Sequence, residues 1–159
     1  MHPNNHRPQL YYPMFAKTNV IYLRTRSLFL LLRVHDISSS WNAITASAHG
    51  GMFMPARNEW FKAYWPLLEQ LTTHVANVEN EMLKATFYPE RELAIALKFC
   101  LVVSLSAKAQ MHWLLHRDHE ESAQRALDVV MEVVTVTRTI KDNEFLLLDP
   151  LLGVSSDSF

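Results

Sequence analysis

Cysteine and glycine are both scarce in this sequence. Cys100 is the only cysteine among 159 residues, and the three glycines are Gly50, Gly51 and Gly153. One cysteine excludes a disulfide framework within the chain and a zinc site built from several thiolates. No Gly-rich phosphate-binding motif is present, and so few glycines also disfavour an all-β fold with many turns.

An excess of charge of either sign is missing too. The chain has 15 basic and 16 acidic residues, a formal net charge of −1, so charge alone predicts no attraction to nucleic acid or to an anionic membrane. The longest apolar tract, residues 93–115, is interrupted by Lys98 and Lys108. A charge at the centre of a bilayer costs about 2.5 to 3.5 kcal/mol on insertion scales. The tract therefore predicts a buried helix and no membrane contact, and the N-terminus lacks the pattern of a signal peptide.

Helical periodicity is plentiful from residue 55 onward. Apolar residues recur at steps of three and four across residues 55–82, which predicts one amphipathic helix or two helices that meet at Pro66. Residues 89–117 predict a second helix that is apolar nearly all round and therefore central.

A further helix is predicted over residues 119–139. Asp118 with Glu121 three residues later resembles a capping box, so we expect Asp118 to cap this helix. Its expected buried face consists of Ala123, Leu127, Val130, Met131 and Val134.

The first fifty residues have no clear period. Residues 1–50 are therefore expected to form an irregular arm with a short apolar helix or strand within residues 20–37, which "SSS" (38–40) would end. Residues 51–154 would form the helical domain, and residues 155–159 a mobile tail. The expected fold is all-α, an irregular bundle of about four main helices.

The stretch "HWLLHRDHEE" carries the clearest candidate chemistry. His112, His116 and His119 would form one stripe on an unbroken helix, and such histidines can bind zinc. A helix that starts at Asp118 removes His119 from the stripe. His112 and His116 remain as an alternative metal pair that needs partners elsewhere, such as His74.

Other reactive or clustered residues favour structural roles. Cys100 lies between apolar neighbours, where a thiol stays protonated and inert. The aromatic residues within 60–65 are expected in the core, and the arginines at 24, 26 and 33 on a solvated face. No catalytic residue and no cofactor is predicted, so we expect a protein that is not an enzyme.

The order of motifs resembles the middle regulatory domain of fungal binuclear zinc-cluster transcription factors. Leu115, His116 and Arg117 match the end of that family's long helix, and Asp149-Pro150 matches its later turn. The tryptophan-rich residues 56–71 are similar to the helix that precedes the long one. The sequence departs from the family at Ala126, where the family has cysteine, and at Val129 and Val130, where it has alanines.

The resemblance implies a non-enzymatic regulatory domain in the nucleus that contacts other transcription-factor domains or regulatory proteins. The family reads DNA with a six-cysteine zinc cluster, so one cysteine implies no direct DNA binding by this chain and an incomplete member of the family. Two alternatives remain open. One is a metal-binding helical module, and the other is an interaction module that buries leucines of residues 28–32 or 146–152 against a partner.

Overall fold

The computed structural model describes residues 7–46, 53–85 and 90–140. They form four helices, and no strand occurs within those ranges. The helices are α1 (Arg7–Ala46), α2 (Phe53–Ala85), α3 (Arg91–Leu114) and α4 (Glu120–Arg138). The all-α prediction is confirmed. None of the described helices is both long enough and apolar enough to cross a membrane.

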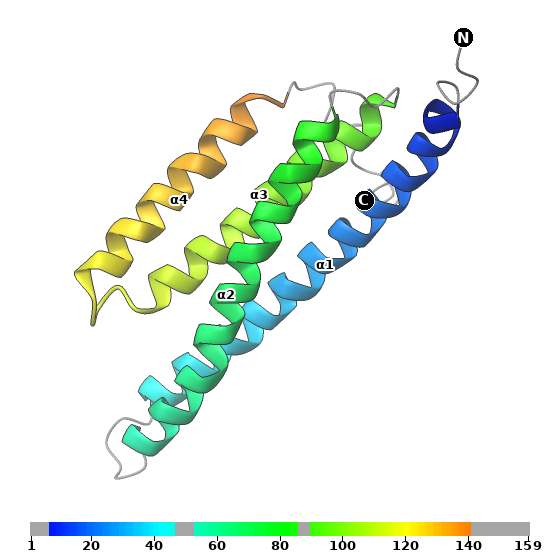
Figure 1. Cartoon of the computed structure of the whole chain (residues 1–159). Helices are drawn as coiled ribbons and strands as arrows, with labels where there is room; N and C mark the ends of the chain where they lie inside the picture. Colours follow the sequence, from blue (N-terminus) through cyan, green and yellow to red (C-terminus); the bar gives the residue numbers. More distant parts are fainter. Residues whose placement is uncertain (1–6, 47–52, 86–89, 141–159) are drawn as a thin grey trace, which may run out of the picture.

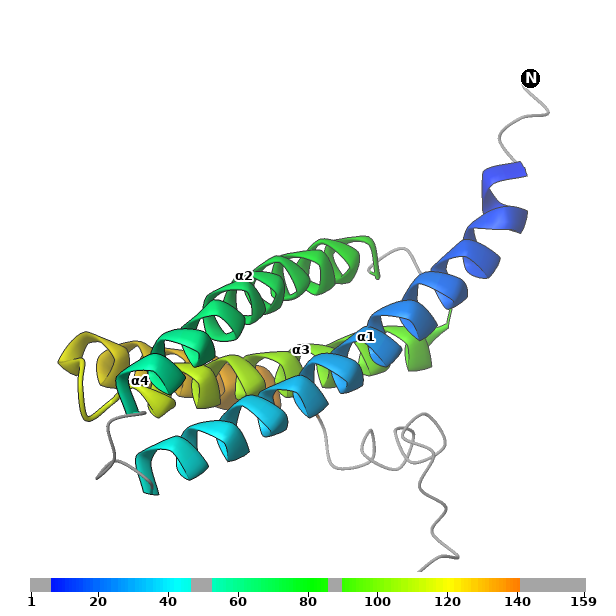
Figure 2. The ribbon, with the colours of Figure 1, turned by 90° about the horizontal axis from the view of Figure 1, so that it is seen from below.

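Helix α3 is the centre of the bundle. It packs against α1, α2 and α4, whereas α4 packs mainly against α3 alone. Figure 1 shows α3 between α4 on one side and α1 on the other, and Figure 2 shows the same helices from below. Buried residues occur all along α3, from Leu93 to His112, which confirms the prediction of a central helix.

Helices α1 and α2 run antiparallel and share a heptad pattern. In each helix the buried positions alternate between steps of four and three residues, the spacing of a coiled-coil seam. Trp41 contacts Trp60 near one end of the pair. Ser27, fourteen residues before Trp41, contacts His74, fourteen residues after Trp60, so the two helices run in opposite directions. The seam positions are Ala16, Val20, Leu23, Ser27, Leu30, Val34, Ile37 and Trp41 in α1, and Trp60, Tyr64, Leu67, Leu71, His74, Val78 and Glu81 in α2, and Ser38 and Val75 are buried next to them.

Two buried aromatic residues of α2 tie the three longest helices together. The indole nitrogen of Trp60 donates to the carbonyl of Ile37 in α1 at 2.9 Å, and the Tyr64 hydroxyl donates to the carbonyl of Met111 in α3 at 2.8 Å. Each ring therefore buries its apolar body without leaving its polar atom unpaired.

Over the described part of the first fifty residues, the prediction of an irregular arm is wrong, whereas the helix alternative for residues 20–37 is confirmed in type but too short. Residues 7–46 form one helix of 40 residues, not an irregular arm, and residues 38–40 do not end it. Ser38 is buried and accepts a hydrogen bond from the Gln110 amide of α3 at 3.1 Å. The heptad seam of α1 was hidden because apolar residues also occupy its exposed positions. Tertiary packing therefore decides that residues 7–46 are helical. This helix belongs to the same core as the helices within residues 53–140.

The other helix predictions hold, with corrections. Helix α2 continues through the exposed Pro66 as one helix, and α3 ends at Leu114, three residues earlier than expected. Helix α4 lies within a residue of its predicted bounds. Pro89, Asp149-Pro150 and the tail predicted at residues 155–159 lie outside the described residues.

The predicted buried face of α4 is wrong. Ala126 and Val129 are buried, with Val133 and Val136 packed beside them, whereas Leu127, Val130 and Met131 are exposed. The true face is rotated by roughly a third of a turn from the predicted one at 3.6 residues per turn. Because α4 packs mainly on one helix, its buried stripe is narrow, and the sequence offers more apolar residues than that stripe holds.

The packing of α1 makes a prediction about two leucines two residues apart. Leu30 is 0% exposed and Leu32 is 64% exposed. We expect Leu30→Ala to lower the free energy of unfolding by about 2 to 5 kcal/mol, because it leaves a cavity. The matched control Leu32→Ala should change it by less than about 0.5 kcal/mol. Urea unfolding of dilute protein followed by circular dichroism measures both, and equal losses would contradict the described orientation of α1.

Candidate functional site

The three histidines of "HWLLHRDHEE" do not share a helix. His112 is in α3, His116 is in the turn formed by residues 115–118, and His119 precedes α4 in an extended conformation. The break between the helices is confirmed, but its predicted cause is not. No side chain caps α4, and the Asp118 carboxylate lies 3.9 Å from the Arg57 guanidinium instead.

His116 and His112 both have surroundings that suit a structural role. The His116 ring stacks on Trp113 with centroids 3.9 Å apart, and its Nδ1 lies 2.6 Å from the Trp113 carbonyl oxygen. His112 is buried, and burial, with Lys108 and Arg125 nearby, lowers its pKa. In the part of the chain that the structure describes, no three metal-binding side chains lie together. The alternative metal pair His112 and His116 therefore gains no support from third ligands such as His74.

Leu115 anchors the turn between α3 and α4, and it is the first of the three residues, 115–117, on which the resemblance to the fungal family rests. Leu115 is buried in the core cluster that contains Trp60 and Met111. His116 is half-buried and Arg117 is exposed. This arrangement gives Leu115 a packing role and leaves Arg117 in solvent.

A buried polar layer crosses the centre of the bundle. His74 Nε2 lies 2.7 Å from the Ser27 hydroxyl oxygen, and the Ser104 hydroxyl lies 3.2 Å from the same oxygen. The three residues come from α2, α1 and α3, and all are buried. A serine beside a histidine is the first requirement of a nucleophilic enzyme, so the layer has to be considered as a catalytic site.

The geometry of this layer argues against catalysis. The Ser27 hydroxyl oxygen also lies 2.8 Å from the Leu23 carbonyl oxygen, an acceptor that competes with His74 Nε2 for the single hydroxyl proton. Ser27 also lies inside a helix, where the backbone N–H groups are already paired and form no oxyanion hole. Cys100 lies next to the layer, and burial raises the pKa of its thiol to about 11, so it stays protonated. The expectation that Cys100 packs in the core is confirmed.

A groove between α2 and α4 is the stronger candidate for a binding site. Its volume is about 610 Å³. The buried Leu101 and Leu105 of α3 form its floor, because α4 leans on α3 and not on α2. Leu83 of α2 and Met131 of α4 form its walls, 73% and 61% exposed. An open groove with an apolar floor and apolar walls is the usual form of a site for another helix.

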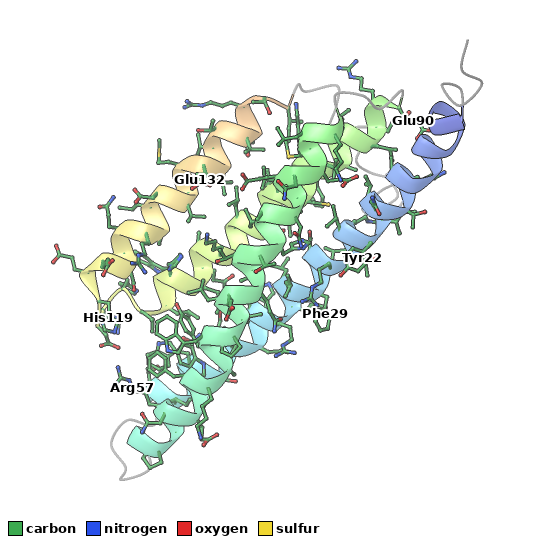
Figure 3. The ribbon with its side chains drawn as sticks, in the orientation of Figure 1. Tyr22, Phe29, Arg57, Glu90, His119 and Glu132 are labelled. Atoms are coloured by element: carbon green, nitrogen blue, oxygen red, sulfur yellow. The ribbon has the colours of Figure 1, made fainter. Side chains whose placement is uncertain are left out.

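The rim of the groove is acidic. Glu79 lies on the α2 side, and Asp128 and Glu132 lie on the α4 side. Figure 3 labels Glu132 on α4. No lysine or arginine lines the described groove, so its field favours a cationic occupant.

Sequence reasoning missed this groove for identifiable reasons. Met131 was assigned to the buried face of α4, and Leu83 lies outside the heptad stripe of α2 that ends at Glu81. The available clue was that α2 and α4 both carry more apolar residues than one core stripe needs. The aromatic prediction holds for the buried Trp60 and Tyr64, but Trp65 is exposed.

Comparisons with known proteins found no match for this chain. No protein-family model matches the chain, and no curated protein or solved structure matches it. The resemblance to fungal zinc-cluster regulators therefore rests on the quoted residues alone and stays a prediction.

The buried histidine makes stability depend on pH. Burial, with Arg26 nearby, lowers the pKa of His74 from 6.5 to about 4. The unfolded chain therefore binds a proton below about pH 6.5, while the folded chain does not until about pH 4. The stability that depends on neutral His74 is complete above pH 6.5 and is lost as the pH falls to 4, by about 3 kcal/mol.

Urea unfolding at pH 7.5, 5.5 and 4 tests this dependence against His74→Gln, which keeps a polar side chain near Ser27. Carboxylates and His112 titrate in both proteins, so the difference between the two profiles isolates His74. We expect the variant to lose less stability between pH 6.5 and 4. Parallel profiles would contradict the assignment of a neutral, buried His74.

Proposed function

We propose that this chain is a non-enzymatic helical domain that binds an amphipathic helix of a second polypeptide chain in the groove between α2 and α4. The observation that carries the proposal is the exposure of Leu83 and Met131 on facing walls above the buried Leu101 and Leu105. An apolar side chain gains about 1.5 to 3 kcal/mol when it is fully removed from water. An amphipathic helix would bury both walls at once and place its own apolar face on the floor.

The other residues that were considered for chemistry are buried, which also favours a binding role for the groove. Ser27 and His74 of the polar layer are buried, and Cys100 is buried beside them. The groove, in contrast, opens to solvent. A binding role is also compatible with the resemblance, under which the domain would act in the nucleus with other transcription-factor domains or regulatory proteins.

The groove predicts that a helical peptide binds through its apolar face. The probes are three synthetic helices of about 18 residues, or five turns, with one shared leucine face and basic, neutral or acidic outer residues. We expect at least one of them to bind the intact chain in calorimetry. Met131→Asp should weaken that binding about tenfold or more, because it places a charge in the wall.

Leu127→Asp is the matched control, because Leu127 is an exposed apolar residue one turn from Met131 on the same helix and does not line the groove. It should leave the affinity unchanged. The proposal fails if none of the three peptides binds, or if Met131→Asp and Leu127→Asp weaken binding equally.

A further inference from the structure

The outer surface of α1 is unusually apolar for an exposed helix face. Five large apolar residues are exposed there at helical spacing, and we name them the α1 stripe: Ile21, Tyr22, Leu28, Phe29 and Leu32. They lie on the face of α1 opposite the heptad seam that α1 uses to pack on α2 and α3. Figure 3 shows Tyr22 and Phe29 projecting from α1 on the side away from α4.

Basic residues lie beside the α1 stripe. Arg26 and Arg33 both lie over the Phe29 ring, with their guanidinium carbons 5.6 Å and 6.0 Å from the ring centroid. These contacts hold both cations beside the apolar residues. From Lys17 to Arg33 the helix has four basic residues and no acidic one.

This composition matches the groove. A helix face that presents leucine and phenylalanine between arginines is complementary to an apolar groove whose charged lining residues are Glu79, Asp128 and Glu132. Burial of the walls would supply most of the affinity, and the charges would set the orientation and the rate of association.

The α1 stripe cannot enter the groove of its own chain. Helix α1 is fixed to α2 and α3 along its heptad seam, and α1 and α4 are not a packed pair. The two surfaces lie on different sides of the bundle, with α3 between α1 and α4 (Figure 1). A contact between them has to form between two molecules.

We infer that the groove between α2 and α4 binds the α1 stripe of a second copy of this chain. The inference rests on the proposed function and names the helix that the groove takes. Such a contact is heterologous, because each copy offers its stripe to one neighbour and its groove to another. The chain would therefore associate head to tail and extend beyond a dimer, unless the rotation between copies closes a ring.

Sedimentation of the full chain over a range of concentrations tests the inference. The wild-type protein should form assemblies larger than one chain as its concentration rises, and added salt should weaken them, because the contact includes opposed charges near the surface. Leu32→Asp removes the stripe, and Leu83→Asp removes the groove. Both side chains are exposed, so neither change disturbs the core, and circular dichroism melting verifies that each variant folds.

Each variant alone should remain a monomer at concentrations about tenfold or more above those at which the wild type associates. An equimolar mixture should form a dimer and nothing larger, because one intact stripe and one intact groove remain between the two variants. Leu127→Asp should associate like the wild type.

Three results would overturn the inference: a wild type that stays a monomer, a mixture that does not dimerise, or a single variant that still associates. A monomeric wild type that binds the basic peptide through Met131 would leave the proposed function standing and point to a different protein as the source of the helix. Failure of both the association and all three peptides would remove the inference and the proposed function together.

Discussion

The apolar surface of α3 extends nearly all round the helix and has to be buried. The positions of α1, α2 and α4 follow from how they cover it. Helices α1 and α2 form an antiparallel pair that covers one part of α3, and α4 covers another. Because α4 is held mainly by α3, it does not close against α2, and Leu101 and Leu105 of α3 become the floor of a groove. The groove is therefore a direct consequence of covering one central helix with three neighbours, when a fourth neighbour would be needed to enclose it.

The polar layer at Ser27, His74 and Ser104 has a different physical role. Ser27 and His74 occupy heptad positions of α1 and α2. The seam positions on either side of Ser27 in α1 are the apolar Leu23 and Leu30. A slip of one heptad would place His74 against Val20 or Val34 and separate its ring nitrogen from Ser27, at a cost of about 1 to 3 kcal/mol. A polar pair in such a seam can fix its register.

Periodicity was sufficient for three of the four helices and insufficient for the site. Helices α2, α3 and α4 have apolar spacings that differ from their surroundings, and α3 is apolar enough to be placed at the centre from sequence alone. Helix α1 was missed because Ile21, Phe29 and Leu32 fill exposed positions and hide the seam formed by Val20, Leu23 and Leu30. The same excess misled the assignment of Met131 to the core. Residues kept apolar for a partner are indistinguishable from core residues in a single sequence. The groove further depends on the separation of two helices, which no local pattern encodes.

Backbone amide hydrogen exchange of α3 and α4 at low and high protein concentration tests the central claim most directly, since it follows both the covering of α3 and the filling of the groove. In dilute protein, the amides of α3 should exchange only through global unfolding, and those of α4 should exchange faster, because α4 packs mainly on one helix. At high concentration, the exchange of α4 should slow as a second copy fills the groove, while that of α3 stays at the global rate. The account would be contradicted if α4 exchanged as slowly as α3 in dilute protein, or if its exchange did not depend on concentration.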